Sequence, residues 1–381
     1  MGISYFFMWQ LYPENGLTYN FTYFLIWSFI FYFGITIFGV PYVAMGYEMS
    51  NDFHERTHIM AVAQWIGQWA WVIAPWFWVI LYDPEWFDDA AAGCRELSIW
   101  VGATCMIFAM IPAIFIKSES TLHEEQFTPL NLKNIGKSVK EIIRGFIEAF
   151  SNIPFRKLCI ATFFIFNSFN TIAAFSFFII VYYMFNGDAG AAGIWPTLHG
   201  SIGALATTFL VIPIVTWMSK KFGKKQTFLI SQGISIIGYI MFWFLFVPGK
   251  PYLFLIALPF FSFGIGGLFT LMMSMTADVC DLDELNTGKR REGIFGAIYW
   301  WMVKFGFAIA GLLSGLFMAW VGFTPDAATQ PEGAVTGMRL FYSGFPIMGT
   351  LIAMWVMKDY DLTEEKAGAI RVALEEKKAG L

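Results

Sequence analysis

Charged residues are scarce in this sequence. Asp, Glu, Lys and Arg make up 14% of its 381 residues, whereas a soluble globular domain contains about 25%. The formal net charge of -4 is small and negative, which argues against a partner made of nucleic acid. Hydrophobic residues make up 57%. The composition therefore argues against a soluble domain and predicts a protein embedded in a lipid bilayer.

Cysteine pairs and catalytic motifs are missing as well. The four cysteines lie far apart, mostly in apolar segments, and none has the CxxC spacing of a redox or metal site, so we expect free thiols. The sequence has no nucleophile elbow, phosphate-binding loop or HExxH motif, and the acidic residues at 278–284 lack the spacing of a calcium-binding loop. We therefore expect no enzyme activity, no cofactor and no bound metal.

Long apolar segments dominate the sequence instead. Residues 1–12 are apolar but too short to cross a bilayer, because twelve helical residues span only about 18 Å. Nine full-length spans are predicted after them, at 19–47, 58–82, 97–116, 155–186, 190–218, 226–247, 251–277, 293–321 and 338–357. The predicted fold class is therefore an all-α polytopic membrane protein.

Lysine and arginine are distributed unevenly between alternate loops. Twenty of the 24 lie in segments on one side of the predicted spans, at 48–57, 117–157, 219–225, 278–292 and 358–381. Short loops rich in these residues stay in the cytoplasm. The pattern therefore predicts a multi-pass protein of the cell inner membrane, with its C-terminus in the cytoplasm.

A polar segment divides the spans into two groups. We predict an N-terminal helix bundle at 1–116, a cytoplasmic linker at 117–153, a C-terminal six-helix bundle at 154–357 and a cytoplasmic tail at 358–381. Within the linker, residues 132–150 place apolar side chains on one side of a helix and basic ones on the other, at Lys133, Lys137, Lys140 and Arg144. This pattern predicts an amphipathic helix that lies on a membrane surface.

The two groups of spans are unequal in number. Six follow the linker, but only three full spans and the short segment 1–12 precede it. Many transporters consist of two six-helix halves joined by a cytoplasmic loop. We therefore expect the N-terminal bundle to be incomplete, lacking two and a half helices. A nine-span protein with a re-entrant N-terminus is the alternative.

Lys304 lies about twelve residues inside the predicted span 293–321. An unpaired charge near the middle of a bilayer costs roughly 3 kcal/mol on insertion scales, so this lysine needs a partner or a water-filled cavity. It shares one helical face with Trp300 and Phe307. We interpret Lys304 as a cation that lines a central cavity and binds a polar or anionic substrate. The alternative is an ion pair with a buried carboxylate, although no other predicted span carries one at this depth.

Carboxamide side chains also occur inside the predicted spans. Gln64 and Gln68 lie one turn apart and are flanked by tryptophans, a combination that suits the hydroxyls and the apolar face of a sugar. Asn167 and Asn170 form a second polar face. For both pairs the alternative is hydrogen bonding between helices. His199 has no metal-ligand companions, so we expect it to be a packing or hydrogen-bonding residue.

Charged residues of both signs gather on the predicted cytoplasmic side. The basic residues are explained by topology alone, but the acidic ones are not. We predict that salt bridges among these residues hold the cytoplasmic side closed and break when it opens. Solvated loop charge is the alternative. The predicted gate residues are Arg56, Asp278, Asp281, Asp283, Glu284, Lys289, Arg290 and Arg291.

The charged segment resembles that of a known family. ADVCDLDELNTGKRREG at 277–293 is similar to the loop signature of the glycoside–pentoside–hexuronide:cation symporters, which belong to the major facilitator superfamily. Val40-Pro41-Tyr42 and Glu55-Arg56-Thr57 resemble motifs around that family's fourth and fifth helices. The basic turn at 219–225 resembles the turn between helices eight and nine of the superfamily. The resemblance covers nearly the whole chain, from the end of the family's third helix to its twelfth.

The resemblance implies the major facilitator superfamily fold, with twelve helices, a central sugar site and cotransport with Na⁺ or H⁺. It also implies that Lys304 matches a helix-eleven lysine near the cation and sugar sites. Three sugar-site positions of the carriers differ here, where an aspartate, a tryptophan and an arginine correspond to Gly39, Val43 and Gln64. A galactoside-type site is therefore not implied.

These observations predict a monomeric secondary transporter that moves a sugar, oligosaccharide or uronide with Na⁺ or H⁺ by alternating access. Two alternatives stay open: a transport-inactive truncated remnant or sensor, and a lipid or lysolipid carrier of the same fold. The predicted substrate-binding residues are Lys304, Gln64, Gln68, Trp300, Tyr42, Asn167 and Asn170.

Overall fold

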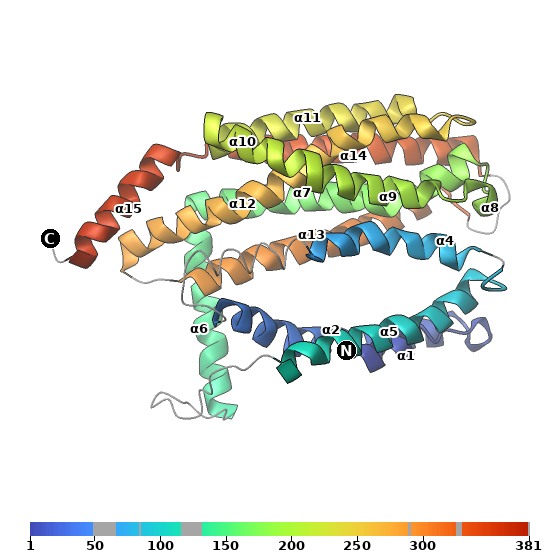
Figure 1. Ribbon diagram of the computed structural model, residues 1–381, viewed down its shortest axis with the longest axis horizontal. Helices are drawn as coiled ribbons and strands as arrows, with labels where there is room; N and C mark the ends of the chain where they lie inside the picture. The colour runs from blue at the N-terminus through green and yellow to red at the C-terminus, as the bar shows by residue number, and fades with distance from the viewer. Residues whose placement is uncertain (49–65, 84, 116–131, 289–290, 325–329, 380–381) are drawn as a thin grey trace. The chain divides into compact units, whose positions relative to one another are not determined.

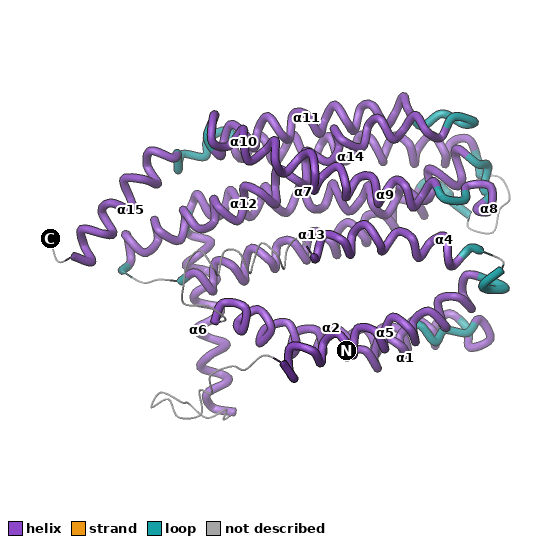
Figure 2. Tube along the Cα trace, viewed as in Figure 1, coloured by secondary structure: helices purple, strands orange, loops and turns teal. Residues whose placement is uncertain are grey.

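The computed structural model describes residues 1–48, 66–83, 85–115, 132–288, 291–324 and 330–379 (Figure 1). Within these ranges the regular structure is helical, with loops and turns between the helices and no strand (Figure 2). Eight of the described helices are long and apolar enough to cross a membrane, and a shorter apolar helix covers Ile66–Leu81. The prediction of an all-α polytopic membrane protein is therefore confirmed. The predicted span 58–82 begins outside the described residues.

The chain divides into two compact units, Met1–Pro129 and Leu130–Leu381. In the N-terminal unit the short helix α1 packs against both α2 and α5. Phe7 of α1 stacks on Trp27 of α2, with ring centroids 4.6 Å apart. A helix too short to cross a bilayer is thus held by longer neighbours, as its polar ends require. The elements of this unit are α1 (Gly2–Met8), η1 (Pro13–Asn15), α2 (Leu17–Glu48), η2 (Ala74–Trp76), α4 (Phe77–Leu81) and α5 (Ala90–Phe115).

The C-terminal unit contains all six predicted spans of that half, with ends that differ from the prediction by several residues. Asn152 begins the first of them, because its side-chain oxygen accepts a hydrogen bond of 3.1 Å from the backbone N–H of Phe155. The elements are α6 (Leu132–Ser151), α7 (Ile153–Phe178), η4 (Ile179–Met184), α8 (Ala189–Ala192), α9 (Trp195–Ala206), η5 (Thr207–Val211), α10 (Ile212–Phe222), α11 (Lys224–Leu245), η6 (Pro251–Ala257), α12 (Leu258–Thr287), α13 (Glu292–Trp320), α14 (Glu332–Met357) and α15 (Glu364–Ala379).

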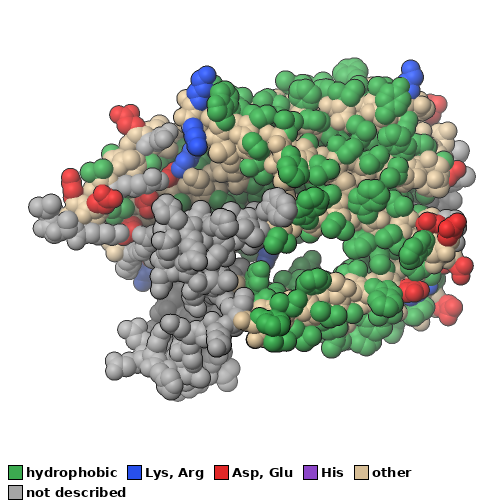
Figure 3. Space-filling view, in the orientation of Figure 1, with side chains coloured by type: hydrophobic (Ala, Val, Ile, Leu, Met, Phe, Trp, Pro, Cys, Tyr) green, Lys and Arg blue, Asp and Glu red, His purple; other side chains and the backbone are tan. Residues whose placement is uncertain are grey.

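Helix α7 forms the centre of this unit and contacts α12, α13 and α14. Its aromatic residues Phe155, Phe166 and Phe175 are at most 2% exposed. On the face drawn in Figure 3, hydrophobic side chains cover the helices of the C-terminal unit, and charged side chains gather near helix ends. Apolar surface on the outside of a buried core is typical of a bundle surrounded by lipid.

Small residues allow neighbouring helices to approach α7 closely. A Cβ atom added at Gly306 of α13 would lie 3.1 Å from the Cβ of Phe166 and 3.3 Å from the backbone oxygen of Phe163. Gly349 of α14 makes a similar approach, because a Cβ there would lie 3.2 Å from the backbone oxygen of Phe164. Glycine at such contacts is the usual way that membrane helices gain van der Waals packing.

The predicted loop at 278–292 is wrong in its first two thirds. Helix α12 continues through the acidic residues to Thr287. It ends at Gly288, whose backbone is left-handed with φ 68°, and whose N–H donates to the oxygen of Glu284 over 2.8 Å. Hydropathy indicated the end of the apolar segment, but the helix extends beyond it because Asp278 and Asp283 are paired with basic side chains.

The contact at Gly306 yields a prediction about stability. We expect Gly306→Val to lower the thermal unfolding midpoint in detergent, because overpacking a close contact costs about 1–3 kcal/mol. Gly315→Val on the same helix is the matched control, since no neighbouring atom of the described residues lies within 4 Å of a Cβ at Gly315. Equal midpoints for the two variants would show that α13 does not approach α7 at Gly306.

Candidate functional site

Arg291 joins three helices of the C-terminal unit at one end of the bundle. Its Nε and Nη2 donate to the two oxygens of Asp283 on α12, over 2.9 and 2.7 Å. Its Nη1 donates to Glu148 on α6. The side chains of Arg291 and Asp283 are 13% and 7% exposed. The two-pronged contact fixes the start of α13 against the end of α12, with α6 as the third member.

The charges of this cluster shift one another's acidity. The hydrogen bond from Arg144, followed by that from Arg291, holds the pKa of Glu148 below its ordinary value. The hydrogen bond to Asp283 raises the pKa of Arg291. Since a lowered carboxyl pKa extends the charged range to lower pH, Glu148 stays charged at neutral pH, and its contacts with Arg144 and Arg291 weaken only as the solution becomes acidic.

A second ion pair lies nearby. Lys224, the first residue of α11, pairs with Asp278 of α12, whose side chain is 4% exposed. The Lys224 Nζ also lies 3.5 Å from the backbone oxygen of Ser274. A buried carboxylate with a charged partner joins the two helices, and removal of either partner would leave an uncompensated charge.

Some of the predicted gate residues form ion pairs, and others lie outside the described residues. Asp278, Asp283 and Arg291 form ion pairs, but these pairs connect helices within the C-terminal unit. Opening and closing of a cytoplasmic gate stays a prediction. Asp281 and Glu284 lie on α12 and also interact, whereas Arg56, Lys289 and Arg290 lie outside the described residues. Sequence reasoning missed Glu148, although its position four residues after Arg144 on an amphipathic helix was a signal.

Lys304 lies on the face of α13 opposite its packed face. Tyr299, Val303 and Gly306 are buried toward the core of the C-terminal unit. Lys304 is exposed, and Trp300 on the same face is 46% exposed. In the described part of the chain, the structure shows no ion pair or hydrogen bond of the Lys304 ammonium group. The lysine therefore points away from α7, which is the orientation that a cavity-lining residue requires.

The carboxamides of α7 are occupied within the protein. Asn167 is 4% exposed, and its amide donates to the backbone oxygen of Gly306 over 3.3 Å. Asn170 is 9% exposed, and its amide donates to the oxygen of Phe166 over 2.8 Å. The Asn167 contact joins α7 to α13 and agrees with the alternative of hydrogen bonding between helices, whereas the Asn170 contact stays within α7. A role of the two residues in substrate binding stays a prediction.

The histidine expectation is confirmed. His199 is buried, and its Nε2 lies 3.0 Å from the hydroxyl oxygen of Tyr342, with a hydrogen bond between them. Aromatic rings surround the imidazole, and the nearest of them belongs to Phe242, with ring centroids 5.7 Å apart. The contact joins α9 to α14 inside the C-terminal unit, so His199 acts there as a packing and hydrogen-bonding residue.

In the N-terminal unit the predicted site residues are only partly described. Gln68 is half-buried on the apolar helix Ile66–Leu81. Tyr42 is 46% exposed and stacks on Phe38, with ring centroids 5.5 Å apart. Gln64 lies outside the described residues. Substrate binding by these three side chains stays a prediction.

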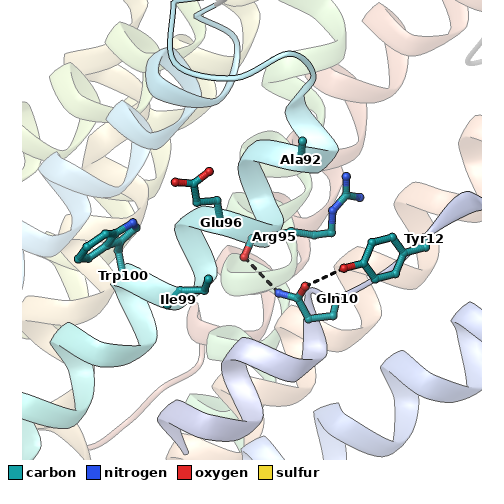
Figure 4. Close-up of a pocket in the computed structure, with 7 residues that line it drawn as sticks. All are labelled: Gln10, Tyr12, Ala92, Arg95, Glu96, Ile99 and Trp100. Carbon is teal, nitrogen blue, oxygen red and sulfur yellow. Dashed lines mark hydrogen bonds between the residues drawn. The ribbon is translucent and has the colours of Figure 1, made fainter.

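A hollow of about 430 Å³ lies between the end of α1 and the start of α5 (Figure 4). Arg95 stands over the ring of Tyr12 at 4.9 Å and donates to the backbone oxygen of Leu11 over 3.0 Å. Gln10 donates to the oxygen of Arg95 over 3.2 Å. These contacts attach the segment after α1 to α5, so the arginine has a structural role. The lining residues are Gln10, Tyr12, Ala92, Arg95, Glu96, Ile99 and Trp100.

Long apolar helices, a six-span C-terminal bundle and charges confined mainly to helix ends define a multi-pass membrane protein. Residues 1–364 match the model of the MFS/sugar transport protein family, and the chain belongs to that family. The resemblance inferred from the motif at 277–293 is therefore confirmed at the level of the family. A family of transporters also agrees with the absence of catalytic motifs from the sequence.

Several curated proteins are similar to this chain. The Glucuronide carrier protein homolog of Escherichia coli (strain K12) is 29% identical over 60% of this chain and 48% of its own length. The Putative sulfoquinovose importer of the same organism is 26% identical over 74% of this chain and 56% of its own length. The Isoprimeverose transporter of Lactiplantibacillus pentosus is 28% identical over 39% of this chain and 31% of its own length. The chain thus spans about half the length of the first two.

The Arg291 cluster yields a prediction about stability. We expect Arg291→Ala to lower the unfolding midpoint strongly, because breaking a buried ion pair costs about 3–5 kcal/mol. Adding Asp283→Asn removes the orphaned charge, so the double variant should recover part of the loss. The control is Arg144→Ala: this side chain is 80% exposed, and an exposed pair contributes at most about 1 kcal/mol. If Arg291→Ala and Arg144→Ala unfold at the same temperature, the cluster does not hold these helices together.

Proposed function

We propose that this protein is a secondary active transporter that moves a sugar, oligosaccharide or uronide across the membrane by alternating access, coupled to Na⁺ or H⁺. The observation that carries the proposal is the family match over residues 1–364. Relatives named Glucuronide carrier protein homolog, Putative sulfoquinovose importer and Putative glycoside/cation symporter support the substrate class and the coupling.

Lys304 is the proposed centre of the substrate site. Its face of α13 carries an exposed ammonium group next to an exposed indole, Trp300. An ammonium group pairs with a carboxylate or donates to hydroxyls, and an aromatic ring covers the apolar face of a pyranose. This combination suits a uronide, whose carboxylate would supply the counter-charge that the described residues do not give Lys304.

The membrane location and topology of the protein are proposed from the distribution of its charged residues. Because Lys and Arg gather in alternate loops, we place the protein in the cell inner membrane with its C-terminus in the cytoplasm. The ends of α12 and α13 that carry Asp283 and Arg291 then lie on the cytoplasmic side. We propose a monomer that needs no cofactor besides the coupling cation.

Uptake into cells or proteoliposomes tests this proposal. A panel of labelled glucuronides and neutral glycosides is offered with a Na⁺ or an H⁺ gradient. For the sugar that accumulates, we expect Lys304→Ala to reduce accumulation about tenfold or more, because a hydrogen bond to a charged group contributes about 1.5–3 kcal/mol. Lys304→Arg should retain part of the activity, because it keeps the charge.

The matched control is Lys250→Ala, which removes an exposed lysine of the same unit outside the proposed site. If Lys304→Ala accumulates the sugar as the wild type does, Lys304 is not part of the substrate site. Binding of lysolipids without uptake of any sugar would contradict the proposed substrate class and favour a lipid carrier instead.

A further inference from the structure

Helix α6 lies across the ends of α7 and α13 and contacts both of them (Figure 1). One strip of the helix is docked on the C-terminal unit. Ala149 is 1% exposed. The ring of Phe146 contacts that of Trp301 edge-on, with centroids 5.8 Å apart, and Phe150 contacts Phe155 in the same way at 6.3 Å. The second half of α6 is therefore attached firmly to the bundle.

A second apolar strip of α6 is not docked. Ile143 and Ile147 lie one turn apart and are 54% and 62% exposed. Basic residues border this strip: Lys140 is exposed, and the side chain of Arg144 is 80% exposed. On a helix with 100° between successive residues, Ile143 and Ile147 occupy the sector next to the docked strip, and Lys140 and Arg144 occupy the sector beyond them. An apolar edge next to a basic edge is typical of a helix at a membrane interface.

We propose that α6 binds the anionic phospholipids of the leaflet at its end of the bundle. In this arrangement Ile143 and Ile147 enter the boundary between headgroups and acyl chains, while Lys140 and Arg144 contact headgroup phosphates. Trp301, which touches the docked strip, is 50% exposed. Tryptophan is enriched at the level of the headgroups.

Charge complementarity selects anionic lipid as the occupant. Residues 132–151 contain four basic and two acidic residues, a net charge of +2, although the whole chain carries -4. One of the two acids, Glu148, is already held by Arg291. Arg156, exposed at the start of α7, adds another cation beside α6. Basic side chains next to an apolar strip match a negatively charged leaflet, which attracts such segments electrostatically.

The proposed lipid contact connects to the Arg291 cluster through one carboxylate. Glu148 accepts a hydrogen bond of 2.8 Å from Arg144 at one oxygen and a second bond from Arg291 at the other. If a lipid phosphate binds Arg144, Glu148 loses that hydrogen bond and keeps the one from Arg291. Anionic lipid thereby competes for the exposed arginine and leaves the Arg291 contact between α6, α12 and α13 intact.

Hydrogen–deuterium exchange of the full chain in nanodiscs tests the proposal. The chain is placed in phosphatidylcholine with and without phosphatidylglycerol. We expect phosphatidylglycerol to slow exchange in peptides from α6. We also expect Lys140→Gln/Arg144→Gln to weaken phosphatidylglycerol binding about 25-fold in a titration in neutral detergent, because each basic residue near the surface contributes about fivefold.

The matched control is Lys250→Gln/Lys366→Gln, which removes the same charge from exposed positions away from α6. It should keep the wild-type response, and Ile143→Ser/Ile147→Ser should lose protection without the loss of charge. Equal exchange of wild-type α6 in both lipid mixtures would overturn the proposal. Full protection in phosphatidylcholine alone would overturn it too, because another part of the protein would then cover the isoleucines.

Discussion

The close contact between α13 and α7 determines which face of α13 is packed and which face is left for a substrate. At Gly306 the two helices approach so closely that a Cβ atom there would lie 3.3 Å from the backbone oxygen of Phe163. The amide of Asn167 then reaches across to the oxygen of Gly306. Because this contact fixes the rotation of α13, the opposite face of the helix must carry Lys304 and Trp300 away from the core. The orientation of the proposed substrate site therefore follows from a packing constraint two residues along the helix.

Ion pairs apply a second constraint at one end of the same bundle. Asp278 and Asp283 are nearly buried, so each needs a basic partner, and Lys224 and Arg291 supply them from other helices. Glu148 extends the contact to α6. The residues that resemble the family's loop signature thus join α11, α12, α13 and α6 inside one unit. Any movement of this unit would carry these ends together, and α6 would transmit contact with the membrane surface to them.

Much of the fold was predictable because bilayer-spanning helices have a strong signal in hydropathy. The spans, the amphipathic helix at 132–150 and the family motif at 277–293 were all found in the sequence. The prediction of a loop at 278–292 was wrong in its first two thirds, because hydropathy detects the end of an apolar segment and not the end of a helix. Pairing between Glu148 and Arg291 could not be predicted, since 143 positions separate them. The same limit applies to Asn167, whose contact with Gly306 depends on how two distant helices cross.

The central claim is that Lys304 faces a substrate-binding cavity. A cysteine at this position, in a background in which the four native cysteines are replaced, can be labelled with a small water-soluble thiol reagent. We predict rapid labelling of Lys304→Cys that slows when the transported sugar is added. We predict little labelling of Met302→Cys, because the Met302 side chain is on the packed face and is 8% exposed. Labelling at 304 that no transported sugar slows, in a variant that still folds, would contradict the claim.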